Sequence, residues 1–449
     1  MEHRTMDTAP RPGARWTALI DEIVAGRWTN PETGRLASVP YETIVIDESL
    51  DGAEADLVAG LGLGERFTVV TDTNSWDAMG ARVATALRRL GPVETVVLDH
   101  PHADMAQAQV LGEKLQGADA VVAVGSGTIN DLVKFVTGKA GKRYAVFGTA
   151  ASMNGYTSTT ASITLDSGLK VSLPSQGPAG FFVDLGVSAA APRHLSAAGF
   201  ADCLVRSVAQ VDWWMSHRLL STLYSSVPYI IQETDEAELN ARAAGIAEGD
   251  IAANGYLHRV LTLCGLGVSF TGMSNHGSMG EHQISHYIDC FAGADHPGTL
   301  HGQQVGVATL TMARLQRHFL DSETPPVIRP TRIDPVDMAR RMGPDIAAQC
   351  FAELKDKIFD AHGAARINER FAELWPTLRA ELDAFALPVT EMETLLSDAG
   401  GPMTAADLGL PAARYREAVV HSREMRNRYS FLDVAADAGI LEDFAAGEA

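Results

Sequence analysis

The sequence predicts two domains, an α/β domain with a doubly wound parallel sheet at residues 1–190 and an all-α domain at residues 191–449. Between residues 41 and 187, short β-branched runs alternate with helical stretches, the pattern of parallel strands joined by crossover helices. After Ser188, long alanine- and leucine-rich helical stretches replace the valine runs. With 449 residues, the chain is too long for one ordinary core and long enough for two.

Five runs are the predicted strands of this Rossmann-like domain. They are FTVVTD, TVVLDH, AVVAVG, YAVFGT and FFVDLG, at residues 67–72, 95–100, 120–125, 144–149 and 181–186. Residues 76–90 and 103–115 carry apolar side chains at helical spacing and are the predicted helices between strands. Pro192 suits the first turn of the first helix of the second domain, where its missing N–H costs nothing. The proline-rich residues 321–335 are expected to form an exposed connection between helices.

The composition favours a folded globular enzyme and excludes several other classes. Hydrophobic residues make up 46% and charged residues 20% of the chain, which argues against extended disorder. The net charge of -20 disfavours nucleic acid as a partner. No stretch reaches the roughly 18 apolar residues of a membrane span, and residues 1–16 lack the apolar core of a signal peptide. Four scattered cysteines without C-x-x-C pairing favour a reducing cytoplasm. The apolar helical half favours a homo-oligomer.

The turn after the third predicted strand has the features of a phosphate site. Gly125, Ser126 and Gly127 stand just before a helix that is expected to begin near Thr128. Glycines let backbone N–H groups approach a pyrophosphate, and a helix N-terminus adds partial positive charge. Asn130 replaces the third glycine of the G-x-G-x-x-G fingerprint, so a turn that needs glycines only for its own geometry stays an alternative.

Two carboxylates would affect the binding of a nucleotide. Asp131, near the helix start, would repel a phosphate unless it turns toward backbone donors, and Lys134 could partly offset its charge. Asp72 ends an earlier predicted strand, at the sheet edge where an acid accepts hydrogen bonds from an adenosine ribose. A loop-capping aspartate is the alternative for Asp72. An acid at the ribose disfavours a 2′-phosphate, but the choice between NAD and NADP stays open.

Three residues far apart in the chain offer one carboxylate and two imidazoles, a set suited to a borderline divalent cation. Asp202 lies in AAGFADCLVR, near an expected helix start, and His301 begins HGQQVGVATLTMARL, an expected helix entry. His282 and His286, in GEHQISH, are four residues apart and share one face if this segment is helical. Three ligands leave a position for a substrate oxygen, as at a catalytic ion. Two nearby histidines are rival ligands: His276 and His296.

Five blocks occur in order along the chain: GSGTINDLVK, TAASMNGYTSTTASI, AGFADCLVRSVAQVDW, GEHQISHYID and LHGQQVGVATLTMARL. With RNRYSFLDVAADAGI near the C-terminus, they resemble the sn-glycerol-1-phosphate dehydrogenases. These enzymes are relatives of the iron-containing alcohol dehydrogenases, glycerol dehydrogenases and dehydroquinate synthases. The resemblance implies a dehydroquinate synthase-like fold.

The resemblance also implies roles for individual residues. Asp202, His282 and His301 correspond to the metal ligands of the family. The ion that they hold is expected to be zinc, or else nickel or iron. His286 corresponds to a histidine that contacts the substrate. Asp72 corresponds to the acid at the ribose. The dinucleotide pocket corresponds to Gly125, Ser126, Gly127, Thr128, Asp131, Thr149, Ser152 and Ser158.

Asn154 departs from the family pattern, because many members carry a substrate-contacting aspartate at this position. Asparagine still accepts a hydrogen bond through its oxygen, but it adds an amide donor and removes a charge. This change eases the binding of an anionic substrate, and it could also mark a changed substrate. With Asp202 and His286, Asn154 completes the expected catalytic residues.

The expected reaction is a reversible hydride transfer between NAD or NADP and a polyol or polyol phosphate, with one divalent cation as Lewis acid. By resemblance, the substrate pair is dihydroxyacetone phosphate and sn-glycerol 1-phosphate, and His286 relays a proton or holds a hydroxyl. A dehydroquinate synthase-like lyase that uses NAD transiently is the alternative. It would need more cations at the cleft, whereas residues 149–163 contain no Lys or Arg. A non-catalytic nucleotide-binding module is the third hypothesis.

Overall fold

The computed structural model describes residues 14–448. The N-terminal stretch for which the sequence predicts no signal peptide falls mainly in residues 1–13, outside the described residues. The first half of the chain forms a six-stranded parallel sheet with the order β1-β8-β5-β4-β2-β3. Its strands are β1 (Thr43–Asp47), β2 (Phe67–Asp72), β3 (Val93–Leu98), β4 (Ala120–Gly125), β5 (Tyr144–Gly148) and β8 (Gly180–Asp184).

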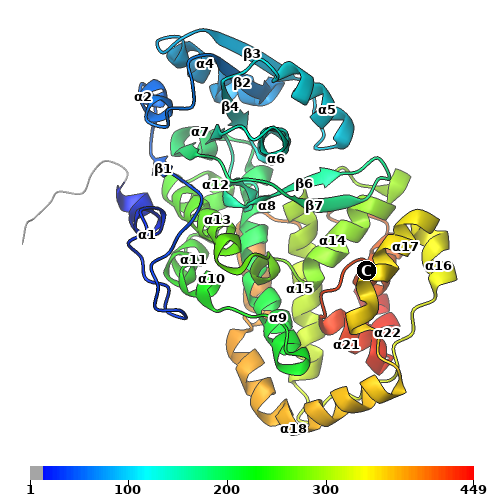
Figure 1. The fold of residues 1–449 in the computed structure, drawn as a ribbon. Coiled ribbons are helices and arrows are strands. Elements are labelled where there is room, and N and C mark those ends of the chain that lie inside the picture. Colours follow the sequence, from blue (N-terminus) through cyan, green and yellow to red (C-terminus); the bar gives the residue numbers. More distant parts are fainter. Residues whose placement is uncertain (1–13, 449) are drawn as a thin grey trace, which may run out of the picture.

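The sheet is covered on both faces, as the doubly wound prediction requires. On β4, Val121 and Ala123 join one apolar cluster, whereas Val122 and Val124 join a second cluster on the opposite face. Helices α2 (Glu54–Ala59) and α4 (Ala81–Leu87) contribute to the second cluster. The first cluster is completed by residues of α1 (Ala14–Val24), α5 (Met105–Lys114), α6 (Gly127–Lys139) and α13 (Ile251–Thr271), as Figure 1 allows the reader to follow. Buried on both sides, β4 and β5 are continuous apolar runs, and β8 is apolar up to its last residue, Asp184.

Five of the six sheet strands agree with the predicted runs within two residues, and three further strands were missed. The edge strand β1 has the short run TIVID, in which partly exposed residues alternate with buried ones. Such a run stands out from the surrounding sequence less than the fully apolar runs of the central strands do. The antiparallel hairpin of β6 (Thr160–Thr164) and β7 (Lys170–Pro174) is rich in Ser, Thr and Lys. In place of the helix predicted at residues 76–90, three segments follow one another without a break: α3 (Thr73–Ser75), the π-helical turn η1 (Trp76–Gly80) and α4.

The second half of the described chain is helical and contains no strand after β8. Its helices are α7 (Leu185–Ala190), α8 (Arg193–Leu204), α9 (Arg206–Leu220), α10 (Val227–Ile230), α11 (Glu233–Asn240), α12 (Ala243–Glu248), α13, α14 (Gly280–Phe291), α15 (His301–Leu320), α16 (Pro335–Met342), α17 (Pro344–Glu353), α18 (Ala361–Phe385), α19 (Val389–Asp398), α20 (Ala412–His421), α21 (Phe431–Ala438) and α22 (Leu441–Gly447). Residues 321–334 connect α15 to α16 without a helix or strand, as predicted. Pro192 is the N-cap of α8, one residue before its first turn.

The main core of the helical half gathers α9, α14, α15 and α18 to α22 around Phe371, Trp375 and Tyr415. Leu263 and Leu266 of α13, however, belong to the cluster beneath the sheet. The division into residues 1–190 and 191–449 therefore stays a prediction, because one core crosses it. Within residues 14–448, no helix combines the length and apolar character needed to cross a membrane.

Candidate active site

A cavity of about 570 Å³ lies where the N-terminus of α6, the loop after β5 and helices α8, α13, α14 and α15 meet. Most of the predicted site residues line it: Ser126, Gly127, Thr128, Asp131, Ser152, Asn154, Ser158, Asp202, His282, His286 and His301. Asp72, Gly125 and Thr149 are not part of its wall. The cavity thus joins the predicted phosphate turn to the predicted metal ligands, and its size is that of an ordinary small-molecule site.

The three predicted ligands come together from three helices. One ligand atom each of Asp202, His282 and His301 lies within 4.8 Å of the other two. His301 is the first residue of α15, and His282 and His286 share a face of α14, as expected. The expectation for Asp202 was wrong, because it lies in the third turn of α8 rather than near its start. The preceding Gly199 does not interrupt α8: a Cβ there would sit 1.8 Å from the carbonyl oxygen of Ala151, so glycine serves the close packing.

Hydrogen bonds outside the trio orient both imidazoles. The Nδ1 of His282 lies 2.9 Å from Glu281 Oε1, and a carboxylate can only accept, so Nδ1 carries the proton. Ser285 Oγ donates to Gln304 Oε1 and must therefore accept from His301 Nδ1, 3.0 Å away. In its neutral form each ring consequently presents the lone pair of Nε2 toward the shared point. Such partners are what metal-binding histidines ordinarily have.

Asp202 supplies a carboxylate oxygen that lacks a hydrogen bond. Its Oδ2 accepts the backbone N–H of Asn154 at 3.0 Å, whereas its buried Oδ1 has no hydrogen-bond partner among the described residues. Oδ1 lies 3.5 Å from His282 Nε2. Burial raises the pKa of Asp202, but His282 and His301 lower it further, so the net shift is downward. The ionised Asp202 therefore has positive charge beside it in this buried site, and a divalent cation held by the neutral imidazoles would supply the same charge.

The N-terminus of α6 forms the nucleotide side of the cavity. Its N-cap residue, Ser126, makes no side-chain capping bond, which leaves the first amides of a 13-residue helix for a ligand. At Gly127 a Cβ would lie 3.2 Å from the Met153 side chain, so a larger residue would crowd this turn. Asp131 Oδ2 accepts the backbone N–H of Ser162 at 3.3 Å, as expected of an acid turned toward a backbone donor.

The chain resembles known dehydrogenases in sequence. Residues 45–192 match the family model described as iron-containing alcohol dehydrogenase. The glycerol-1-phosphate dehydrogenase (NAD(P)+) of Halalkalibacterium halodurans is 28% identical, over 81% of this chain and 85% of that protein. The enzyme of the same name from Methanothermobacter thermautotrophicus is 31% identical, over 56% of this chain and 71% of that protein. This chain belongs to the glycerol-1-phosphate dehydrogenase family.

Solved structures agree with this family in fold. A probable glycerol dehydrogenase from Sinorhizobium meliloti aligns with a TM-score of 0.58 and 19% identity, over 91% of this chain and 98% of that one. A 1,3-propanediol oxidoreductase aligns with a TM-score of 0.60 and 16% identity, over 90% and 98% of the two chains. As a member of the glycerol-1-phosphate dehydrogenase family, the protein is an NAD(P)-dependent oxidoreductase of CH–OH groups.

Asn154, at the position where the resemblance implies an aspartate in many family members, lines the cavity. The Asn154 side chain lies 3.5 Å from Cys264 Sγ through its Nδ2, while its backbone supports Asp202. An aspartate would place a second, half-buried carboxylate beside Asp202. Asn154 therefore lowers the negative charge next to the trio in this member of the glycerol-1-phosphate dehydrogenase family.

His286 is neutral and presents a proton donor. An arginine can only donate, and Arg426 Nη2 lies 2.7 Å from His286 Nδ1, so the ring proton is on Nε2. Burial and the neighbouring cations hold the pKa of His286 well below its usual value. The rivals His276 and His296 are outside the trio, because His276 Nε2 bonds Cys264 O at 2.8 Å and His296 Nε2 lies 3.1 Å from Asp289. The sequence prediction named neither Arg426 nor Asp289 as a site residue, although Arg426 begins the C-terminal block RNRYSFLDV.

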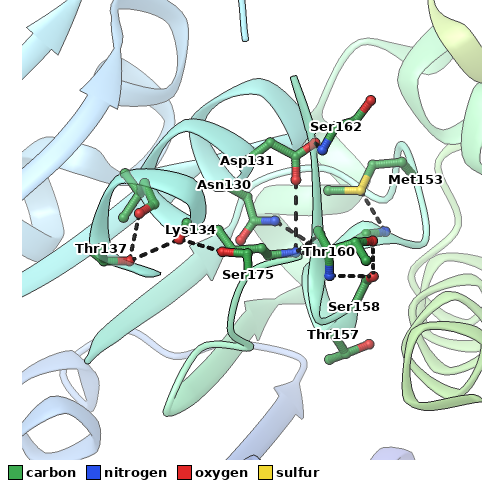
Figure 2. A network of polar contacts seen from close by, with 12 residues as sticks. Asn130, Asp131, Lys134, Thr137, Met153, Thr157, Ser158, Thr160, Ser162 and Ser175 are labelled. Atoms are coloured by element: carbon green, nitrogen blue, oxygen red, sulfur yellow. Dashed lines mark hydrogen bonds and ion pairs between the residues drawn. The ribbon is translucent and has the colours of Figure 1, made fainter. Parts of the chain in front are cut away.

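Lys134 ties α6 to the loop that carries Asn154 and Ser158 (Figure 2). Its fully buried ammonium group donates to Gly155 O and, at 3.2 Å, to Thr160 O, and lies 3.8 Å from Asp131 Oδ1. These contacts hold the nucleotide side of the cavity against the metal side. Lys134 thus has a structural role beyond the charge offset expected from the sequence.

Replacement of Lys134 by methionine tests this buried cation. Burial lowers the pKa of Lys134 to about 8, from the 10.5 of an exposed lysine. Between these values the unfolded chain binds the proton and the folded chain does not, so stability rises with pH there. The quantity to compare is the unfolding free energy of the wild type minus that of Lys134→Met. We expect this difference to be independent of pH below pH 8 and to rise by up to roughly 3 kcal/mol by pH 10.5. Urea unfolding at several pH values measures this difference, and a curve without pH dependence would contradict the assignment.

The three predicted residues away from the cavity wall have structural contacts. Asp72 caps α3, with Oδ1 accepting the N–H of Ser75 at 2.8 Å, which is the capping alternative. Gly125 and Thr149 lie behind the wall, joined by a bond from Thr149 N to Gly125 O of 3.2 Å. Contact of Asp72 with a ribose stays a prediction.

Proposed function

We propose that this protein interconverts dihydroxyacetone phosphate and sn-glycerol 1-phosphate, with NAD or NADP as hydride carrier. The observation that carries the proposal is the convergence of Asp202, His282 and His301 on a cavity shared with the open N-terminus of α6. The substrate pair is taken from the names of the relatives, whose alignments cover 81% and 82% of this chain. No observation favours the lyase alternative.

Asp202, His282 and His301 would hold the divalent ion, for which we propose zinc, with nickel or iron as substitutes. When bound, such an ion polarises the substrate C–O bond as a Lewis acid. Glu281 and Ser285 keep the two imidazoles in the tautomer that binds a cation, and Asn154 holds the other oxygen of Asp202. His286, with its proton on Nε2, donates to a substrate oxygen or relays a proton to it.

The dinucleotide would lie along the opposite side of the cavity. Its diphosphate would accept hydrogen bonds from the amides near Ser126, Gly127 and Thr128, where the helix dipole adds positive charge. Ser152 and Ser158 offer hydroxyl groups in the wall of the same cavity. Asp72 at the end of β2 would disfavour a 2′-phosphate if it met the ribose, and the choice between NAD and NADP stays open.

A metal-dependence assay tests the proposal. Purified protein with NADH or NADPH is expected to oxidise the cofactor when dihydroxyacetone phosphate is added. Chelator treatment is expected to lower this rate at least about 100-fold, since the Lewis acid supplies several kcal/mol, and Zn²⁺, Ni²⁺ or Fe²⁺ to restore it. In metal-loaded enzyme, absence of cofactor oxidation with phosphorylated and free ketones, together with absence of NAD(P)+ reduction with the matching polyols, would refute the dehydrogenase function.

We also propose a reducing compartment, since all four cysteines are free thiols in the structure. A cytoplasmic location, a homo-oligomeric state and the absence of nucleic acid as a partner stay predictions.

A further inference from the structure

A second cavity, of about 240 Å³, adjoins the first at a positively charged corner. Lys170, Ser172 and Arg426 line both cavities, so their side chains stand at the boundary between them. Lys170 comes from β7 and Arg426 from the segment after α20, 256 positions further along the chain. Neither residue has a role in the cation site or at the α6 N-terminus.

Arg426 is a partly buried guanidinium that forms no ion pair with any described residue. Two other arginines of this region have one: Arg341 lies 2.6 Å from Glu424, and Arg423 lies 3.6 Å from Asp433. Arg428, which also lines the smaller cavity, has none among the described residues but donates to Ser278 O and Ser274 Oγ. The bond to His286 uses one of the five N–H groups of Arg426, and no other hydrogen bond of this guanidinium occurs in residues 14–448. Buried charges are ordinarily paired, so this arrangement indicates an anion that comes from outside the chain.

Lys170 adds a second positive charge that is only partly neutralised. Its Nζ lies 2.8 Å from Asp289 Oδ2, but the other oxygen of Asp289 is 3.1 Å from His296 Nε2. The backbone N–H of Lys170 bonds Cys290 Sγ at 3.4 Å, which fastens the hairpin to α14. Glu353 also lines the smaller cavity, yet it forms no ion pair with Arg426. With the two carboxylates of Asp289 and Glu353 against the three cations Lys170, Arg426 and Arg428, the lining of the two cavities keeps a net positive charge at this corner.

The position of the corner relative to the trio matches a short substrate with a charged end. The ring of His286 lies 5.4 Å from that of His301 and 6.2 Å from that of His282, between centroids. Arg426 contacts the Nδ1 edge of His286, and Nε2 is the donor on the opposite side of the ring. A molecule with one oxygen at the trio and an anionic group at Arg426 would therefore extend along the His286 ring.

We propose that Arg426, assisted by Lys170, binds the phosphate of the substrate and so selects phosphorylated over free polyols. This inference rests on the proposed dehydrogenase function and adds a specificity determinant to it. The planar guanidinium offers paired N–H groups to phosphate oxygens, while its contact with His286 fixes the substrate relative to the proton donor.

The test compares two substrates that differ only in phosphate. Arg426→Gln is expected to lower kcat/KM for dihydroxyacetone phosphate by about 10- to 100-fold and to change that for dihydroxyacetone less than about 3-fold. Arg426→Lys should recover part of the loss, and Lys170→Met should show a smaller loss of the same kind. Arg416→Gln, at an exposed position of α20, is the matched control and should leave both values unchanged.

Equal losses on both substrates would overturn the proposal, because they would mean that Arg426 serves only to hold His286. A second readout is independent of turnover: calorimetric titration of inorganic phosphate into metal-loaded enzyme saturated with NAD+, which occupies the diphosphate site. Phosphate should bind the wild type and bind Arg426→Gln at least about 10-fold more weakly. Equal binding by both would also overturn it. An inactive wild type that still binds phosphate through Arg426 would refute the dehydrogenase function and retain the anion site.

Discussion

His301→Ala is expected to lower kcat at least about 1,000-fold and to remove the stoichiometric metal from the purified protein. The substitution deletes one of three ligands and leaves the ionised, unpartnered Oδ1 of Asp202 facing a single imidazole. Loss of Lewis-acid stabilisation worth several kcal/mol corresponds to a rate factor of this size. Steady-state kinetics and elemental analysis of the same preparation measure both effects.

His318→Ala is the matched control, because His318 lies on the same helix, α15, and its side chain is exposed. Its kcat and metal content should equal those of the wild type. A His301→Ala protein that keeps its metal and works within tenfold of the wild-type rate would exclude His301 as a ligand.

Gly199→Ala is expected to destabilise the fold and impair the site together. The new Cβ would lie 1.8 Å from the carbonyl oxygen of Ala151 and 2.8 Å from its carbon, and backbone cannot swing aside as a side chain can. Helix α8 must then move from the loop after β5, and Asp202, three residues further along α8, moves with it. We expect a loss of about 1 to 3 kcal/mol of unfolding free energy. A displaced ligand should also cost about 100-fold in kcat.

Denaturant unfolding and kinetics measure the two effects of Gly199→Ala, with Gly117→Ala as control. Gly117 is exposed, and a Cβ there meets no atom within 4 Å, so its unfolding free energy should stay within about 0.5 kcal/mol of the wild type. If Gly199→Ala weakened stability without lowering kcat or metal content, the link between α8 packing and Asp202 would be wrong.

Buried parallel strands could be predicted from the sequence because both of their faces are apolar. β2 and β4 have the predicted bounds, and β3, β5 and β8 differ by one or two residues. The edge strand β1 and the hairpin of β6 and β7 escaped prediction, because a strand with one solvated face mixes polar and apolar residues. The hairpin matters for function, since it carries Lys170 to the cavity boundary.

The ligand trio could be predicted because its chemistry is rare and its residues lie in blocks that resemble one family. The support around it could not: Glu281, Ser285 and Arg426 are ordinary residue types whose partners appear only when the helices pack. The same holds for Asp202, whose place in α8 depends on the close approach of Gly199 to Ala151.

The sequence by itself determined the layered sheet and the helical second half, which follow from periodicity. It also determined the family and the three candidate ligands, which follow from short blocks that resemble one family. Only the tertiary structure decided which imidazole nitrogens face the shared point, that Asp72 caps a helix, and that Arg426 forms no ion pair with a described residue. Those properties depend on distances between segments that are far apart in the chain, and no local pattern encodes such distances.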